Sequence, residues 1–111
     1  TNRYFDKGFI YVSISSSKEL LKIGCTKNVE NRTSGLNNLS YGGINDWKII
    51  YYDEVKKNAG KIEFAIHKKL SKFFYPVNYL RNGVTVICRE IFKCDKNYVL
   101  ETVKNIINEN T

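Results

Sequence analysis

The spacing of hydrophobic and polar residues divides the chain into short segments with either a strand-like or a helix-like pattern. Residues 9–14 and 20–25 are rich in β-branched and aromatic side chains, and the polar stretch 15–19 between them predicts a β-hairpin. Residues 47–52 share that composition and predict a third strand, and residues 84–92 predict a fourth.

Three other segments carry apolar residues at the period of a helix. The first begins after Asn28, a residue type favoured at helix N-caps, and its buried stripe contains Arg32. The second covers residues 58 to about 73, and the third follows Asp95, which can cap it. Since strands joined by a short turn must be antiparallel, we expect an α/β fold of the α+β type. About three helices should flank a small mixed or mainly antiparallel sheet of three to four strands.

Composition limits the class of protein. The 111 residues, 42% hydrophobic and 26% charged, suit a single domain covering residues 1–111, and the lack of methionine indicates excision from a longer chain or a processed N-terminus. No apolar run approaches the length of a membrane span or signal peptide, so we expect a cytoplasmic or other intracellular location and no membrane partner. A nuclear location is the alternative in a eukaryotic or viral host. No C-x-x-C pair is present, which excludes a disulfide framework and a four-ligand zinc site; we interpret Cys25, Cys88 and Cys94 as buried or idle thiols.

The charge favours a polyanionic partner. Lys and Arg outnumber Asp and Glu by 18 to 11, which gives a net charge of +7. The second predicted helix has a basic side, and the tyrosine-rich segment 75–83 is interpreted as an aromatic loop beside it. We expect DNA as the partner, with RNA as the alternative, bound by a monomer or homodimer. The residues predicted to contact nucleic acid are Lys68, Lys69, Lys72, Arg81 and Arg89.

Three polar side chains are expected to meet on one face of the sheet. If Tyr11 pairs with Lys22, residues 16–17 form a two-residue turn, and the phenol and the ammonium lie side by side. Arg32 would reach them from the first helix. Each residue also has a structural explanation: a strand tyrosine packs in the core, a strand lysine reaches solvent, and a helix arginine extends outward.

The triplets 9–11 (Phe-Ile-Tyr) and 22–24 (Lys-Ile-Gly), followed by Arg32, resemble the signature of the GIY-YIG nuclease superfamily. Lys22 lies 11 positions after Tyr11, and Arg32 lies 10 positions after Lys22, as in that family. Phe9 replaces the usual glycine, and Lys22 replaces the usual tyrosine. The lysine is similar to that of a restriction-enzyme and phage-type branch.

That branch also has a helical glutamate followed by a histidine, and a later glutamate before aromatic or aliphatic residues. Glu63 with His67, and then Glu90, match this order, so the resemblance covers residues 8 to about 95. It implies a metal-dependent DNA endonuclease that hydrolyses phosphodiester bonds, of the kind found in phages, mobile elements or restriction systems. Glu90 would hold one Mg²⁺, or Mn²⁺ in its place.

The resemblance also implies the other roles. Tyr11 would deprotonate the attacking water, while Lys22 would favour the phenolate or orient that water. Arg32 would stabilise the transition state, and His67 would be an auxiliary base or phosphate contact, or else structural. Asn105 on the last predicted helix is a weaker phosphate-contact candidate, and a solvent-facing asparagine is favoured there.

Two alternatives remain open at this stage. Regular strand geometry through Glu90 would point its carboxylate to an apolar side, so an ion pair with Arg32 or Lys22 competes with metal coordination. A catalytically silent nucleic-acid-binding or protein-interaction module of the same fold would explain the changed first triplet.

Overall fold

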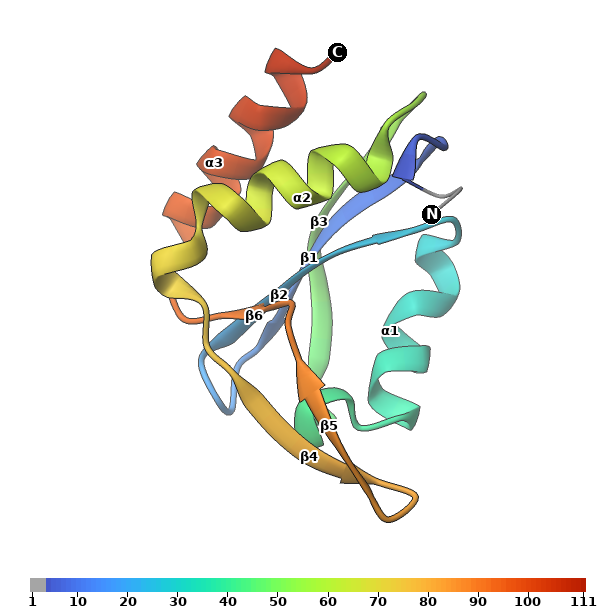
Figure 1. Cartoon of the computed structure of the whole chain (residues 1–111), viewed down its shortest axis with the longest axis vertical. Coiled ribbons are helices and arrows are strands. Elements are labelled where there is room, and N and C mark those ends of the chain that lie inside the picture. The colour runs from blue at the N-terminus through green and yellow to red at the C-terminus, as the bar shows by residue number, and fades with distance from the viewer. Residues whose placement is uncertain (1–3) are drawn as a thin grey trace.

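The computed structural model describes residues 4–111 as a four-stranded antiparallel sheet, a separate two-stranded sheet and three α-helices (Figure 1). The elements in chain order are β1 (Gly8–Ser15), β2 (Leu20–Thr26), α1 (Val29–Asn38), the 3₁₀ turn η2 (Tyr41–Gly43), β3 (Trp47–Val55), α2 (Ala59–Lys69), the 3₁₀ turn η3 (Ser71–Phe73), β4 (Val77–Arg81), β5 (Val84–Cys88), β6 (Ile91–Phe92) and α3 (Lys96–Glu109). This confirms the expected α+β fold.

The four-stranded sheet has the order β3-β1-β2-β6 and is covered on both faces. On one face, Ile10 and Val12 of β1 pack against apolar residues of α2 and α3. On the other face, Tyr11 packs in a smaller cluster with Leu36 of α1 and Trp47 of β3. Because β1 is central, residues of both parities along it are buried, and this removes the polar alternation of a half-exposed strand.

The helix starts agree with the sequence. The side chains of Asn28 and Asp95 accept hydrogen bonds from the backbone N–H groups of Asn31 and Tyr98, so both predicted N-caps are confirmed. The predicted end of the second helix is wrong. Helix α2 ends at Lys69, and residues 71–73 form a 3₁₀ turn.

The pairing of β1 with β2 corrects the predicted register by two residues. Tyr11 lies opposite Gly24 rather than Lys22, and the connection is the four residues 16–19 rather than a two-residue turn. The wider turn is held by the carboxylate of Asp46, which accepts hydrogen bonds from it. A shift of two residues keeps every side chain on its face, so Tyr11 and Lys22 are still on the same side.

Two further expectations are wrong around the last strands. The segment interpreted as a loop contains β4, which pairs with β5 in an antiparallel hairpin. The predicted continuous strand 84–92 is interrupted, because Arg89 and Glu90 form a bend between β5 and β6. Glu90 therefore lies outside any strand, and strand geometry does not set the direction of its side chain.

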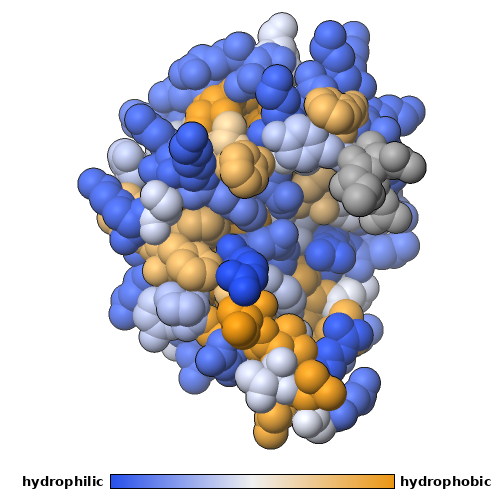
Figure 2. Space-filling model, viewed as in Figure 1, coloured by the Kyte–Doolittle hydropathy of each residue, from blue (hydrophilic) through white to orange (hydrophobic). Residues whose placement is uncertain are grey.

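The surface is mainly polar in the view of Figure 2, and apolar side chains gather in its lower part, over the β4–β5 hairpin. Within residues 4–111, no helix is both long and apolar enough to cross a membrane. The three cysteines in this range are free thiols, of which Cys88 is buried and Cys25 and Cys94 are half-buried.

Candidate functional site

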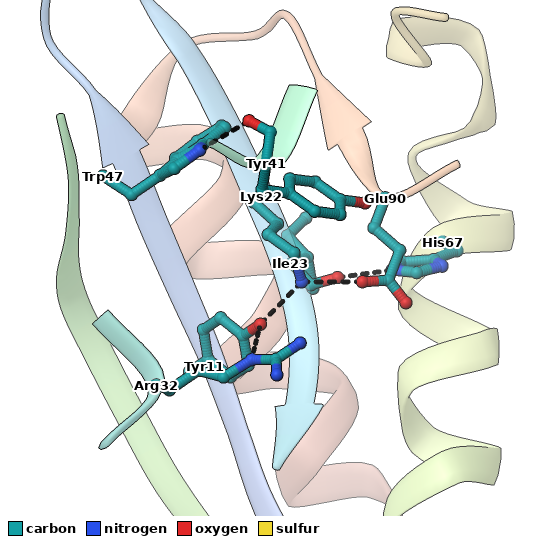
Figure 3. A network of polar contacts seen from close by, with 8 residues as sticks. All are labelled: Tyr11, Lys22, Ile23, Arg32, Tyr41, Trp47, His67 and Glu90. Carbon is teal, nitrogen blue, oxygen red and sulfur yellow. Dashed lines mark hydrogen bonds and ion pairs between the residues drawn. The ribbon is translucent and has the colours of Figure 1, made fainter. Parts of the chain in front are cut away.

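The centre of the site is a buried contact between Tyr11 of β1 and Lys22 of β2. The Lys22 Nζ donates a hydrogen bond to Tyr11 Oη at 2.6 Å, and both side chains have no exposed surface (Figure 3). Tyr11 and Lys22 are diagonal neighbours across the two strands, and Gly24 is the residue directly opposite Tyr11. A Cβ on Gly24 would lie 2.6 Å from Tyr11 Oη and 2.7 Å from Lys22 Nζ, so only glycine leaves room for this contact.

Arg32 reaches the same phenolic oxygen from α1. Its Nε donates to Tyr11 Oη at 2.9 Å, and the residue is only half-buried. The cap at Asn28 fixes the start of α1, and Arg32 lies on the first turn, where the stripe that includes buried Leu36 faces the sheet. The predicted convergence of Tyr11, Lys22 and Arg32 is therefore observed, despite the changed register.

Glu90 joins this network through an ion pair. Its Oε1 lies 2.7 Å from Lys22 Nζ, and its side chain is 34% exposed. Burial alone would lower the pKa of Lys22. The negative charge of Glu90 and the hydrogen bonds with Glu90 and Tyr11 outweigh burial and raise this pKa above its ordinary value, so the ammonium stays charged.

Tyr41 is part of the site and was missed by the sequence analysis. The Lys22 Nζ lies 4.9 Å from the centre of the Tyr41 ring and 4.8 Å from that of Tyr11, so two aromatic rings flank the ammonium. The Tyr41 backbone carbonyl accepts a hydrogen bond from Trp47 Nε1 at 3.0 Å. Burial raises the pKa of Tyr41 strongly, so its hydroxyl stays neutral. No periodic pattern identifies a residue in such a short turn.

The site lies beside the part of β2 where its pairing with the short strand β6 ends. Among the described residues, β6 pairs with only Leu21 and Lys22 of β2. The next residue of β2, Ile23, makes its backbone hydrogen bonds to groups outside the strands. Its N–H donates to the Glu90 carbonyl at 3.1 Å, and its carbonyl accepts from His67 Nε2 at 2.8 Å. A carbonyl can only accept, so Nε2 carries the proton. Burial lowers the pKa of His67, which favours the neutral ring.

Glu63 and His67 of α2 line one pocket with Glu90, as their spacing on one helix face predicts. The pocket has a volume of about 420 Å³. Burial, and secondarily the charge of Glu90, raise the pKa of Glu63 to about 7. The two glutamates line the same pocket and are the residues there that could hold a hard cation such as Mg²⁺, which needs few protein ligands. The described residues contain no group of three or more His, Cys, Asp or Glu positioned for a metal.

The residues predicted to contact nucleic acid lie outside the hydrogen-bonded network of the site. All five are exposed. Arg89 also lines the pocket with Glu90, and Arg81 ends β4 at the far end of the hairpin. Asn105 is exposed on α3, which is the solvent-facing arrangement. The other three predicted nucleic-acid contacts are Lys68 and Lys69 at the C-terminal end of α2 and Lys72 in η3.

Comparisons with known proteins give one match. The family model described as the T5orf172 domain matches residues 8–107, which include every residue of the site. Searches of curated proteins and of solved structures return no match to this chain.

Proposed function

Because the chain belongs to the T5orf172 domain family, a phage-associated, nuclease-like family, we propose that it is a metal-dependent DNA endonuclease of the GIY-YIG type. The observation that carries the proposal is the single network of Tyr11, Lys22, Arg32 and Glu90. Hydrolysis of a phosphodiester needs a group that takes a proton from water, a donor for the developing negative charge, and a site for a metal ion. The network offers one candidate residue for each of these three requirements.

Tyr11 is the proposed proton acceptor. Its oxygen accepts hydrogen bonds from two cationic donors, Lys22 and Arg32, which stabilise negative charge on it. The carboxylate of Glu90 keeps the Lys22 ammonium charged while both Tyr11 and Lys22 are buried. The half-buried Arg32 and the partly exposed Glu90 connect this pair to the surface, where the phosphate of the substrate would lie.

Arg32 is the proposed donor to the transition state. Its Nε is bound to Tyr11, which leaves the two terminal nitrogens of the guanidinium as a fork for phosphate oxygens. A donor fixed before the reaction stabilises developing charge without reorganisation. We therefore assign Arg32 mainly to turnover and less to affinity.

Glu90, with Glu63 across the pocket, is the proposed metal-holding residue. Only Oε1 of Glu90 is bound to Lys22, and about a third of the side chain is exposed. A Mg²⁺ or Mn²⁺ ion held there would supply charge stabilisation to the leaving 3′ oxygen. His67, tied to Ile23, would hold α2 and its glutamate against this edge of β2.

One observation favours the silent module as a second candidate. Two of the three N–H donors of Lys22 are used within the protein, on Tyr11 and Glu90. A site arranged only for stability would show the same pairing. The two candidates differ in one outcome, because the silent module would bind DNA without cutting it.

The test is cleavage of supercoiled plasmid by the native protein and by Tyr11→Phe, which removes only the hydroxyl. We expect metal-dependent nicking that the variant loses by about 100-fold or more, the usual worth of a general base. Tyr98→Phe is the matched control, because Tyr98 is exposed on α3. Native-like nicking by Tyr11→Phe would contradict the proposal, and DNA binding with no nicking by any protein would favour the silent module.

A further inference from the structure

A long acid-free segment leads into the site. Residues 64–89 contain no Asp or Glu, although Glu63 precedes them and Glu90 follows them. All five residues predicted to contact nucleic acid lie within this segment, and it includes the whole β4–β5 hairpin. A basic segment without carboxylates beside a proposed phosphodiester site is complementary to a polyanion.

The hairpin has one covered face and one open face. Val77 and Tyr79 pack toward the buried cluster that holds Tyr11 and Trp47. The opposite face carries two cross-strand pairs, Asn78 with Ile87 and Leu80 with Thr85. All four of these residues are exposed.

The open face is unusually apolar for an exposed surface. Leu80 is 73% exposed and Ile87 is 49% exposed. Val84 at the tip is 63% exposed, but it pairs with Arg81 and so belongs to the other face. Figure 2 shows apolar side chains gathered in its lower part, where β4 and β5 lie. An exposed apolar patch of this kind, rimmed by polar and basic residues, marks an interaction surface.

We propose that the open face of the β4–β5 hairpin enters the major groove of double-stranded DNA and selects the phosphodiester that reaches Glu90. The inference rests on the proposed function and extends it to substrate selection. A two-stranded antiparallel ribbon fits the major groove of B-form DNA. The deep, narrow major groove of A-form RNA does not admit it, so the partner of this face is DNA.

The chemistry of the face suits base edges in that groove. Leu80 and Ile87 offer apolar contact to the C5 methyl group of thymine, while Asn78 and Thr85 offer hydrogen-bonding groups to base edges. The exposed Arg81, at the end of β4 beside the tip, offers a cation to a phosphate. The hairpin therefore combines charge attraction with groups that distinguish one sequence from another.

The base of the hairpin is firmly joined to the site. Cys88 at the end of β5 is buried, and only Arg89 separates it from Glu90. At the start of the hairpin, the Tyr75 N–H donates to the Ile91 carbonyl at 2.9 Å. The position of the ribbon in the groove would thus fix the position of Glu90 along the DNA backbone.

The test replaces the two apolar residues of the open face, as Leu80→Ala and Ile87→Ala. Their exposure should leave the fold intact, which thermal unfolding checks, and Leu39→Ala is the matched control because Leu39 is 53% exposed outside the hairpin. Binding and cleavage positions are measured on end-labelled duplexes that contain thymine, and on the same duplexes with uracil, which lacks the C5 methyl. We expect each hairpin variant to bind the thymine duplex about tenfold more weakly, to lose the difference between thymine and uracil, and to cut at altered positions.

The outcomes separate the inference from the proposed function. Weaker binding by the hairpin variants in a protein that never cleaves would support the groove contact and reject the nuclease. Native-like binding and cleavage positions in both variants would overturn the inference and leave the nuclease untouched. Loss of self-association in sedimentation, with DNA binding unchanged, would also overturn it, because the face would then join two copies of the chain.

Discussion

Gly24 lies directly against Tyr11, and the space that its missing side chain leaves is occupied by the contact between the phenol and Lys22. A Cβ there would come within 2.6 Å of Tyr11 Oη. This steric requirement explains why a glycine ends the second triplet. The glycine allows two strands to bring a phenol and an ammonium together beneath the sheet surface.

The first prediction concerns Gly24→Ala. The added methyl must displace the Tyr11 or Lys22 side chain, so we expect nicking to fall at least about tenfold and the free energy of unfolding to fall by roughly 1–3 kcal/mol. The control is Gly35→Ala, because a Cβ at Gly35 has no neighbour within 4 Å. In helix α1 this control should raise the free energy of unfolding by about 0.5–1 kcal/mol and keep activity. Equal behaviour of the two variants in plasmid nicking and urea unfolding would contradict the prediction.

The second prediction concerns the ion pair of Lys22 with Glu90. Glu90→Ala leaves the ammonium buried with one fewer partner, and we expect a loss of about 1–3 kcal/mol in the free energy of unfolding, moderated by water at the exposed side. Lys22→Met should cost less, because Glu90 can be solvated. A double-mutant cycle by urea unfolding should give a coupling of about 1 kcal/mol or more. Additive losses would show that the two charges do not stabilise each other.

The third prediction concerns the shape of the Arg32 side chain. Arg32→Lys keeps the charge but cannot hold Tyr11 through Nε while presenting a two-pronged donor to phosphate. We expect kcat to fall by about 100-fold to 1,000-fold, with the Kd for DNA changed only a few-fold. Arg81→Lys should instead change the Kd with kcat maintained. A loss for Arg32→Lys confined to the Kd would place Arg32 in binding only.

The fourth prediction concerns two groups with opposite effects of pH on stability, measured in the presence of EDTA. The pKa of His67 is lowered from 6.5, so the unfolded chain binds more protons, and the stability due to His67 falls as pH falls below 6.5. The pKa of Glu63 is raised from 4.5 to about 7, so the stability due to Glu63 falls as pH rises from 4.5 to 7. In His67→Gln, the free energy of unfolding should keep the pH dependence due to Glu63. In Glu63→Gln, it should keep the pH dependence due to His67. Identical stability curves between pH 4.5 and 7 for both variants would contradict this account.

The faces of the elements follow from sequence, whereas the register of the strands does not. Strand periodicity and the helical stripe are enough to bring Tyr11, Lys22 and Arg32 together. The turn between the first two strands depends on Asp46, far away in sequence, which accepts from Ser15 Oγ at 2.6 Å and from another N–H of the turn. Because these two segments are far apart in the sequence, no local sequence pattern predicts the contact or the register that depends on it.

The β4–β5 hairpin, by contrast, has a local signal in its sequence. Asn82-Gly83 is a dipeptide favoured in hairpin turns, and both residues have the positive φ that such turns need, 52° and 77°. The tyrosines around it favoured the wrong interpretation as a loop. The bend at Glu90 has no comparable signal, since the contacts made there, the ion pair with Lys22 and the bond of the Glu90 carbonyl to Ile23, are distant in sequence.

The most direct test of the central claim is the nicking of supercoiled plasmid with Mg²⁺, with Mn²⁺ and with EDTA, by the native protein beside Glu90→Gln. The amide can still accept from Lys22 Nζ, so this variant tests the charge of Glu90 with little effect on the fold. The account predicts nicking with either metal, none with EDTA, and a loss of activity in the variant together with weaker Mn²⁺ binding by electron paramagnetic resonance. Nicking that persists in EDTA, or a variant as active as the native protein, would contradict it.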